Sequence, residues 1–363
     1  MSRARGIAVM LVVTACVMVI AAVVLWPGRV VPAFRDDPAG PAGQAATSQP
    51  GARSQPGGGS RAGRPSWQWT VGGADLASRG IVVHYPAGAR RRLPRVPASA
   101  YVVADAATGQ VLAAKDPHGE YPPASTLKVL TAITLIPLLN PDATVVATRR
   151  ATSVEPNVVG LKLGRAYQVS SLFKALLLIS ANDAAVSLAE ATGSFRRAMT
   201  LMNAEARWLQ AYDVVAKDPN GLPAAHQHVS AYDEALIARR ALAMPAFMKY
   251  DATLAARFQV KRRKWVTLVN QNTLLLKYRG AVGGKIGWTD RAKATYIGMA
   301  RRHGVTLIVT ILHARPLTEI ISAERLLNWG FAMDRKVRPV GMLVPPLPGG
   351  LADQLASHEP PAG

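Results

Sequence analysis

Three short motifs of the sequence combine residue types that can carry out acyl-transfer chemistry. The first, STLK, runs from Ser125 to Lys128, follows two prolines and opens an apolar helical pattern. Residues three apart on a helix share a face, so the Ser125 hydroxyl and the Lys128 amine should lie within hydrogen-bond reach. A lysine desolvated beside a serine can lose its proton and act as a base. Ser125 could equally be a helix N-cap and Lys128 a solvated helix residue, so the pair alone does not decide.

The second motif, SAN, runs from Ser180 to Asn182, between an apolar helical segment and a helix expected to begin at Asp183. A hydroxyl and an amide at such a break could project into a cleft, where they would relay a proton and hold a peptide bond. Ser180 and Asp183 also fit a helix capping box, which would be a purely structural role.

The third motif lies in the stretch AVGGKIGWTD, residues 281–290, which contains Lys285, Gly287, Trp288 and Thr289. Its alternating small and apolar residues predict a strand, and its glycines indicate that another group approaches the backbone closely. Lys-x-Gly alone is common, as KLG at residues 162–164 shows. The weight of this motif therefore depends on the other two.

The order and spacing of the three motifs are more specific than any one of them. Ser-x-Asn follows Ser-x-x-Lys by 55 residues, and Lys-x-Gly follows after another 105. This trio, usually with Lys-Thr-Gly, marks penicillin-binding proteins and β-lactamases. Residues from about 98 to 315 resemble the low-molecular-mass penicillin-binding proteins, the serine D-alanyl-D-alanine carboxypeptidases of peptidase family S11, especially actinobacterial ones. The segments GLKLGRAYQVSSLFKALLLISANDAA and DPNGLPAAHQHVSAYDEALIAR extend the resemblance beyond the motifs.

The resemblance implies a DD-peptidase/β-lactamase-like α+β fold, with an antiparallel sheet flanked by helices and a mostly helical second region. It implies that Ser125 is the nucleophile, that Lys128 is its base, and that Ser180 passes a proton to the leaving D-alanine. Asn182 would hold the substrate amide and Lys128. Lys285 would bind the terminal carboxylate of the substrate and keep the pKa of Lys128 low.

The resemblance also implies the remaining parts of a substrate site. The backbone amides of Ser125 and Trp288 would form the oxyanion hole, and Gly287 would let the substrate pair with the strand edge. The substrate would be a peptidoglycan stem peptide ending in D-Ala-D-Ala, and water would hydrolyse the acyl-enzyme. β-Lactams would be covalent inhibitors, and no cofactor or metal is implied.

Ile286 departs from the pattern, because the resemblance predicts a threonine whose hydroxyl donates to the substrate carboxylate. Losing a hydrogen bond to a charged group costs roughly 1.5 to 3 kcal/mol, or about ten- to a hundredfold in rate or affinity. We expect Lys285 and Thr289 to carry more of this contact, so that Thr289→Val should lower activity. No physical reason for isoleucine is evident in the sequence.

Three alternatives stay open at this point. A class A-like β-lactamase shares all three motifs, but none of Glu190, Glu205 and Glu234 begins the Glu-x-x-Leu-Asn loop that such enzymes use. A degenerate, non-catalytic wall-binding protein would explain Ile286. A DD-endopeptidase uses the same acyl-enzyme chemistry and cannot be separated from a carboxypeptidase on these residues.

The first 97 residues predict export to the cell surface. Residues 1–6 are expected to be cytoplasmic, since Arg3 and Arg5 precede an uncharged run at residues 7–26 that is long enough to cross a bilayer. That run is expected to be a signal anchor, giving a single-pass membrane protein with its catalytic domain outside. Cleavage near Ala33 or lipidation at Cys16 are alternatives. Residues 27–66 are a Pro/Gly/Ser-rich linker without enough apolar residues to order, and residues 67–97 an extended segment leading into the domain.

The catalytic domain is expected at residues 98–345 and a disordered tail at 346–363. Strand patterns at both ends with helical patterns between them suggest an antiparallel sheet covered by helices. The chain carries a net charge of +21, which favours anionic partners, but nucleic acid is the least suitable of these behind an export signal. Cys16 is the only cysteine, so the exported part has no disulfide or thiolate metal site. None of the seven histidines lies in an H-E-x-x-H arrangement.

Overall fold

The computed structural model describes residues 70–350. The predicted cytoplasmic end, signal anchor, Cys16 and linker lie outside the described residues, as do residues 67–69 and 351–363. Within residues 70–350, no helix is both long enough and apolar enough to cross a membrane.

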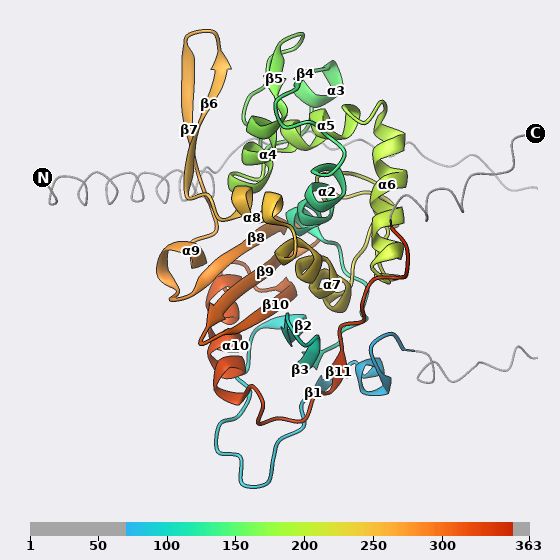
Figure 1. Ribbon diagram of the computed structural model, residues 1–363, viewed down its shortest axis with the longest axis vertical. Helices are drawn as coiled ribbons and strands as arrows, with labels where there is room; N and C mark the ends of the chain where they lie inside the picture. Colours follow the sequence, from blue (N-terminus) through green and yellow to red (C-terminus); the bar gives the residue numbers. More distant parts are fainter. Residues whose placement is uncertain (1–69, 351–363) are drawn as a thin grey trace, which may run out of the picture. The chain divides into compact units, whose positions relative to one another are not determined.

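An antiparallel sheet of seven strands forms the centre of the described chain (Figure 1). Its order is β1-β3-β2-β10-β9-β8, with β11 paired to β3, so β8 is an edge strand. The strands are β1 (Ile81–Val82), β2 (Ala98–Asp105), β3 (Gln110–Lys115), β8 (Ala281–Thr289), β9 (Lys293–Arg302), β10 (Val305–Ala314) and β11 (Gly341–Met342). The sheet thus uses both ends of the domain, as the strand patterns predict.

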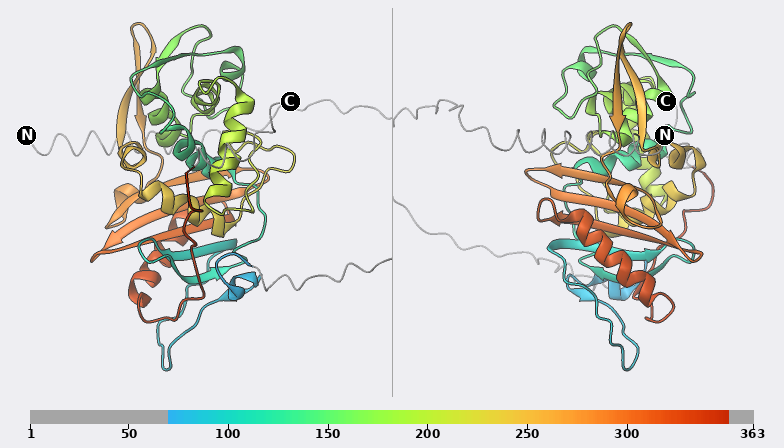
Figure 2. Two further views of the ribbon diagram at one scale, coloured as in Figure 1. Left: turned by 45° about the vertical axis from the view of Figure 1, so that its right-hand side comes forward. Right: turned by 90° about the vertical axis from the view of Figure 1, so that its left-hand side faces the viewer.

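Alternation along the central strands divides the core into two clusters. In β10, Leu307, Val309 and Ile311 face the cluster under α10 (Glu319–Met333), while Ile308 and Leu312 face the opposite cluster. Successive side chains of a strand point to opposite faces, so one run of apolar residues serves both layers. On the second face, α7 (Ala231–Leu242) packs against β10 and β2 (Figure 2).

Most of the remaining described helices build a second region above the sheet in the view of Figure 1, while α9 lies beside β8. The remaining described helices are α2 (Leu127–Leu135), α3 (Arg149–Thr152), α4 (Val169–Leu178), α5 (Asn182–Glu190), α6 (Phe195–Trp208), α8 (Pro245–Asp251) and α9 (Leu274–Lys277). Two small hairpins join them, β4 (Thr144–Val146) with β5 (Ala166–Gln168) and β6 (Ala255–Lys261) with β7 (Lys264–Val269). The sequence-based prediction includes neither hairpin: β4 and β5 have only three residues each, and β6 and β7, although Phe258, Val260 and Leu268 are buried, lie in a stretch where no strand is predicted.

Both flanking segments belong to the folded unit. The segment before β2 contains the short 3-10 turn η2 (Ala74–Ala77) and β1, while its arginines at positions 90–92 and 95 are exposed. At the other end, Trp208 Nε1 donates to the backbone oxygens of Leu347 (3.0 Å) and Gly349 (3.1 Å). The folded unit therefore reaches at least to Gly349, rather than ending at residue 345 as predicted.

Candidate active site

Ser125 lies in the 3-10 turn η3 (Ala124–Thr126), directly before α2. Ala124 has a φ of 49°, in the left-handed region that side-chain-bearing residues rarely adopt. Such strain persists only where the surrounding structure fixes it, often at functional sites. All nine residues of α2 are buried, so Lys128 is fully enclosed one turn after Ser125.

The amine of Lys128 is the centre of the site. Its Nζ lies 2.8 Å from Ser125 Oγ, 2.7 Å from Asn182 Oδ1 and 2.7 Å from the backbone oxygen of Asn220. A neutral amine has two N–H bonds and one lone pair. It can therefore donate to Asn182 and Asn220 while its lone pair accepts the proton of the Ser125 hydroxyl.

The electrostatics favour this neutral form. Burial lowers the pKa of Lys128 well below its usual value, the cation of Lys285 lowers it further, and Asp218 opposes both. The predicted effect of Lys285 is therefore present, but burial is the larger cause. The geometry and the lowered pKa of Lys128 are those that a general base for Ser125 requires.

Asn182 and Ser180 lie at the start of α5, where the sequence predicts a break. Besides accepting from Lys128, Asn182 donates from Nδ2 to the backbone oxygen of Glu155 at 2.8 Å, so one of its two amide protons is already in use. Ser180 has a φ of 61° and a buried Oγ with no hydrogen-bond partner in the described part of the chain. Buried hydroxyls usually have a partner, so this one is free to serve a ligand.

Asp183 has a role that the sequence does not predict. The capping-box interpretation is wrong, because the carboxylate of Asp183 accepts the N–H groups of residues 159, 160 and 161 at 3.0, 2.8 and 2.9 Å. The backbone N–H of Asn182 donates to Asn157 at 2.7 Å. These bonds fix the loop at residues 155–161 against α5, and with it the orientation of Asn182.

Lys285 lies in the edge strand β8 with only 2% of its surface exposed. Its Nζ donates to the backbone oxygen of Ile286 at 2.7 Å. Burial lowers the pKa of Lys285 to about 7, and the carboxylate of Asp251 opposes that shift. Asp251, at the end of α8, accepts the N–H of Gly284 at 2.7 Å, and burial raises its pKa to about 7. The sequence gives no sign of Asp251, which lies 34 residues before Lys285.

Gly287 is required by the nucleophile turn itself. A Cβ at this position would lie 2.7 Å from the Ser125 nitrogen and 3.0 Å from the Thr126 nitrogen, closer than a carbon can approach. The glycine thus lets β8 pack on η3. The predicted reason for a glycine here is the approach of a substrate, but the packing alone already excludes a side chain. Trp288 is 56% exposed, and Thr289 Oγ1 accepts the N–H of Ala292 at 3.0 Å, which leaves its own proton available.

Ile286 packs on the opposite face of β8 from Lys285. Its partly buried side chain joins the cluster under α10, which includes Ala294 and Tyr296. An isoleucine at this position therefore adds apolar contact to the core, which is a reason for its presence that the sequence alone does not show.

The turn at residues 218–222 completes the site and is missing from the sequence-based prediction. Asp218 Oδ1 accepts the N–H of Asn220 at 2.6 Å, which presents the Asn220 oxygen to Lys128. Gly221 has a φ of 82°, and a Cβ there would lie 1.6 Å from the Ala124 oxygen. The Pro-Asn-Gly sequence at residues 219–221 predicts a turn, but no sequence pattern predicts that this turn lies next to Ser125.

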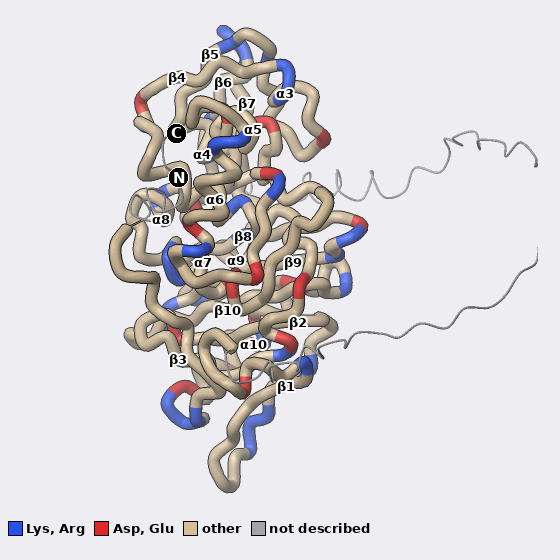
Figure 3. Tube along the Cα trace, turned by 90° about the vertical axis from the view of Figure 1, so that its right-hand side faces the viewer, with Lys and Arg blue, Asp and Glu red and all other residues tan. Residues whose placement is uncertain are grey.

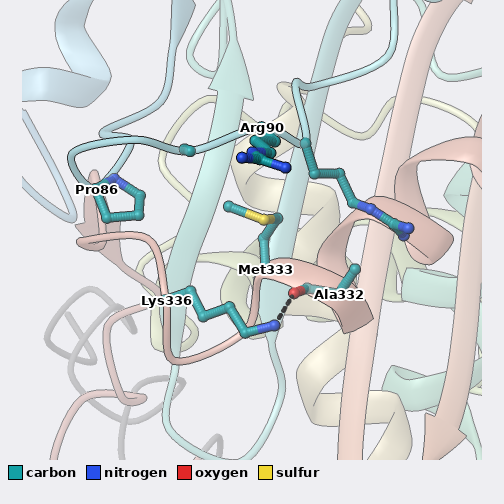
Figure 4. Close-up of a pocket in the computed structure, with 7 residues that line it drawn as sticks. Pro86, Arg90, Ala332, Met333 and Lys336 are labelled. Carbon is teal, nitrogen blue, oxygen red and sulfur yellow. Dashed lines mark hydrogen bonds between the residues drawn. The ribbon is translucent and has the colours of Figure 1, made fainter.

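Other cavities and clusters are less suited to this chemistry. An open groove of about 570 Å³ lies between the segment at residues 86–91 and the end of α10, and contains none of the predicted site residues (Figure 4). Among residues 70–350, one group has ligand atoms close enough to hold a metal: His118, Asp213 and Asp233. Both ring nitrogens of His118 are engaged there, by Asp213 (2.7 Å) and by the Val71 oxygen (3.1 Å).

Comparison with known proteins agrees with this geometry. The family model described as D-alanyl-D-alanine carboxypeptidase, Peptidase S11, matches residues 88–316. The chain is 39% identical over 248 residues to the D-alanyl-D-alanine carboxypeptidase DacB2 of Mycobacterium tuberculosis, covering 67% of this chain and 85% of that protein. It is 27% identical over 242 residues to DacF of Bacillus subtilis, covering 65% of this chain and 62% of DacF, which is less than two thirds of that relative.

Solved structures give the same result. A crystal structure of a D-alanyl-D-alanine carboxypeptidase from Mycobacterium tuberculosis superposes with a TM-score of 0.67 at 38% identity, covering 71% of this chain and 99% of the other. A serine-to-alanine mutant of the Streptomyces K15 DD-transpeptidase superposes with a TM-score of 0.62 at 26% identity, covering 66% and 99%. With its serine–lysine pair, its two further motifs and its antiparallel sheet flanked by helices, the chain belongs to the D-alanyl-D-alanine carboxypeptidase family, Peptidase S11.

Proposed function

We propose that this protein is a serine DD-carboxypeptidase that removes the terminal D-alanine from peptidoglycan stem peptides ending in D-Ala-D-Ala. One observation carries the proposal: Ser125 Oγ lies 2.8 Å from the amine of Lys128, whose pKa is held low by burial. This pair gives an activated nucleophile without a histidine or a metal-bound water.

Acylation begins when Ser125 Oγ attacks the carbonyl carbon of the penultimate D-alanine and Lys128 takes the hydroxyl proton. The developing oxyanion would lie near the backbone N–H groups of Ser125 and Trp288, on the turn and strand that Gly287 packs together. The C–N bond then breaks and the leaving amine needs a proton. The unpartnered hydroxyl of Ser180 is suited to relay it from Lys128.

Deacylation reverses these roles. Water attacks the ester carbon, gives its proton to Lys128, and the Ser125 oxygen leaves as a hydroxyl. The released products are the shortened stem peptide and free D-alanine, and the enzyme returns to its starting state.

The terminal carboxylate of the substrate needs a cationic subsite. Lys285 lies on the edge strand, and a small pocket beside the nucleophile turn is lined by Thr289 and Arg291 together with Pro122 and Pro123. Thr289 offers a hydroxyl and Arg291 a guanidinium, whereas Ile286 offers no hydroxyl. A guanidinium can bind a carboxylate with two hydrogen bonds.

The first test follows intact mass over time for residues 64–363 mixed with benzylpenicillin, beside Ser125→Ala. We expect one penicilloyl adduct on the wild type, a slow return to free enzyme, and no adduct on the variant. An adduct on Ser125→Ala would place the nucleophile elsewhere. Rapid adduct loss with consumption of the drug would mean a β-lactamase.

The second test measures D-alanine release from a pentapeptide stem ending in D-Ala-D-Ala and from a crosslinked dimer. We expect release from the pentapeptide in preference to cleavage of the crosslink. The opposite preference would make the protein an endopeptidase. An absence of both the adduct and the release of D-alanine would leave a wall-binding protein without turnover.

We also propose that the protein is membrane-tethered with its catalytic domain outside the cytoplasm. The support is the uncharged run at residues 7–26 behind Arg3 and Arg5, and the Lys and Arg residues spread along the described chain (Figure 3), among them the exposed Arg90, Arg91 and Arg92. Fractionation of expressing cells should place the full chain in the membrane fraction, sensitive to external protease. Recovery in the medium with a new N-terminus near Ala33 would show cleavage instead.

A further inference from the structure

A buried carboxyl group lies behind the nucleophile turn and has no part in the proposed mechanism. Glu234, in the first turn of α7, has 2% of its surface exposed. One carboxyl oxygen is hydrogen-bonded to Thr126 Oγ1, and the other has no partner among the residues that the structure describes. No ion pair joins Glu234 to a Lys or Arg within residues 70–350. A buried carboxylate without a cation is expensive, so the neutral acid is the expected form.

The hydrogen bonds of Thr126 show what this neutral acid does. Thr126 Oγ1 lies 2.6 Å from the backbone oxygen of Pro123, which also accepts the hydroxyl of Thr295 at 2.8 Å. Thr126 has one hydroxyl proton and cannot donate to both Pro123 and Glu234. Both contacts are satisfied together only when Glu234 donates to Thr126 and Thr126 donates to Pro123. If Glu234 were ionised, it would accept the hydrogen bond of the Thr126 hydroxyl. The backbone oxygen of Pro123 would then accept a hydrogen bond from Thr295 alone.

The two ends of this relay enclose the nucleophile. Pro123 and Thr126 flank Ala124 and Ser125, and Ala124 is the residue in the left-handed conformation. Its shape must be imposed by surrounding contacts, of which the Thr126–Pro123 bond closes the turn directly. A turn that loosens would move Ser125 Oγ away from Lys128, and catalysis is sensitive to such small displacements.

The titration of Glu234 supports the neutral form. Burial raises the pKa of Glu234 to about 8. Only a bond in which Thr126 donates to the ionised carboxylate opposes this shift, whereas a bond donated by the neutral acid does not. Asp233 is adjacent in α7, and the charge of Glu234 contributes to the raised pKa of Asp233. The elements packed on α7 carry these ionisable residues: Lys128 on α2, Asp105 on β2, Lys249 and Asp251 on α8, Lys293, Arg301 and Arg302 on β9, and His313 on β10. None of these groups is among the causes that move the pKa of Glu234.

We propose that Glu234 is a positioning residue for the nucleophile: its protonated carboxyl donates to Thr126 and so holds the turn from Pro123 to Thr126 in the shape that keeps Ser125 against Lys128. Glu234 does not contact the reacting atoms, and its role rests on the proposed function of the Ser125 site. The consequence is a built-in loss of activity at alkaline pH, when Glu234 ionises and the relay breaks.

The test compares acylation by benzylpenicillin from pH 6 to 10 in the wild type, Glu234→Gln and Glu234→Leu. Glutamine keeps a donor for Thr126 at every pH, whereas leucine removes it. We expect Glu234→Gln to match the wild type within about threefold at pH 7 and to be about tenfold faster at pH 9, where a group of pKa about 8 is about nine-tenths ionised. Acylation of Glu234→Leu should be slower than that of the wild type by about tenfold or more at pH 7. The thermal midpoint of each variant is measured as well, to show that it is folded.

The titration of Lys128 and Lys285 affects all three proteins, so the difference between the wild-type and Glu234→Gln profiles isolates Glu234. The same alkaline fall in both would overturn the proposal, even if Glu234→Leu does not fold. A Glu234→Leu variant that is folded and as fast as wild type at pH 7 would also overturn it. Failure of the proposed function would appear separately, as an adduct on Ser125→Ala or no adduct on the wild type at any pH.

Discussion

The charge of one buried lysine, Lys285, affects the titration of another, Lys128, and the proposed chemistry needs the two in opposite protonation states. Lys285 lowers the pKa of Lys128, which must be neutral to accept a proton, while Lys285 must be charged to attract a carboxylate. Each has its own acidic neighbour, Asp218 for Lys128 and Asp251 for Lys285. Both carboxylates also accept backbone N–H groups, Asp218 from its own turn and Asp251 from Gly284.

The Asp251 charge should therefore matter for substrate binding. Asp251→Asn removes the group that opposes the fall in the Lys285 pKa, so Lys285 should lose its proton at lower pH. We expect KM for a D-Ala-D-Ala peptide to rise severalfold at pH 8 with kcat less affected. Because the pKa of Asp251 is about 7, the difference should shrink below pH 6, where the wild-type carboxyl is also neutral. Equal KM values at pH 8 would contradict the coupling.

Position 286 offers a second prediction at the residue scale. Ile286→Thr adds the hydroxyl that the resemblance predicts, but on the face of β8 opposite Lys285, and it removes apolar contact from the cluster under α10. We therefore expect kcat/KM for the peptide to stay within about threefold of the wild type and the free energy of unfolding to fall by about 1 kcal/mol. Ile286→Val is the matched control, since it loses packing without adding a hydroxyl. A threonine variant about tenfold faster than Ile286→Val would show that the subsite uses a hydroxyl at this position.

Local spacing predicts the contact of Ser125 with Lys128, and the family resemblance adds Asn182 and Lys285, but other residues that are distant in sequence are missed. Ser125 and Lys128 are three apart on a helix, so their contact follows from helix geometry. Asn220 reaches Lys128 across 92 residues, and Glu234 reaches Thr126 across 108. Such contacts depend on how the helices pack, and no local spacing encodes them.

At the scale of elements, the site is held by close backbone packing around η3. Gly221 and Gly287 approach the turn from two different elements, one from a loop and one from the edge strand. Glycine is needed where another backbone comes this close. Sequence patterns predict that β8 is a strand and that α2 is a helix. They do not predict that β8 packs on η3, the turn directly before α2.

Gly221→Ala should show how strict this packing is. Its Cβ would overlap the Ala124 oxygen at 1.6 Å, so the turn or the loop must move, and φ of 82° adds strain. We expect a loss of more than about 4 kcal/mol in stability and no acylation by benzylpenicillin. Gly304→Ala is the control, with a similar φ of 79° and nothing within 4 Å of the added carbon. It should cost about 1 to 2 kcal/mol from strain alone and leave acylation unchanged. Equal losses in the two variants would count against the packing argument.

At the scale of the molecule, the buried acids should give an unusual pH dependence of stability. Burial raises the pKa of Glu234 to about 8 and that of Asp251 to about 7, while their ordinary values are 4.5 and 3.8. Between these limits the folded protein binds more protons than the unfolded chain, so the free energy of unfolding falls as pH rises. The stabilisation is complete below about pH 4 and is lost towards pH 7 to 8.

Urea unfolding at pH 5 and pH 7 tests this directly. We expect the wild type to be less stable at pH 7 by about 2 kcal/mol or more, because each unit of pKa shift is worth about 1.4 kcal/mol. The double variant Glu234→Gln with Asp251→Asn should show a smaller change over the same range. A wild type that gains stability from pH 5 to 7 would refute the prediction.

The two ends of the folded unit meet on one strand, which has a mechanical consequence. β1 and β11 both pair with β3 on the far side of the sheet from β8, the strand that carries Lys285. A pull along the chain at Thr70 would first load the contacts of Val71 and Gly72 with His118 and Met342, and then the two-residue pairing of β1. Force applied at Thr70 would therefore be borne first by these contacts at the edge of the sheet farthest from β8.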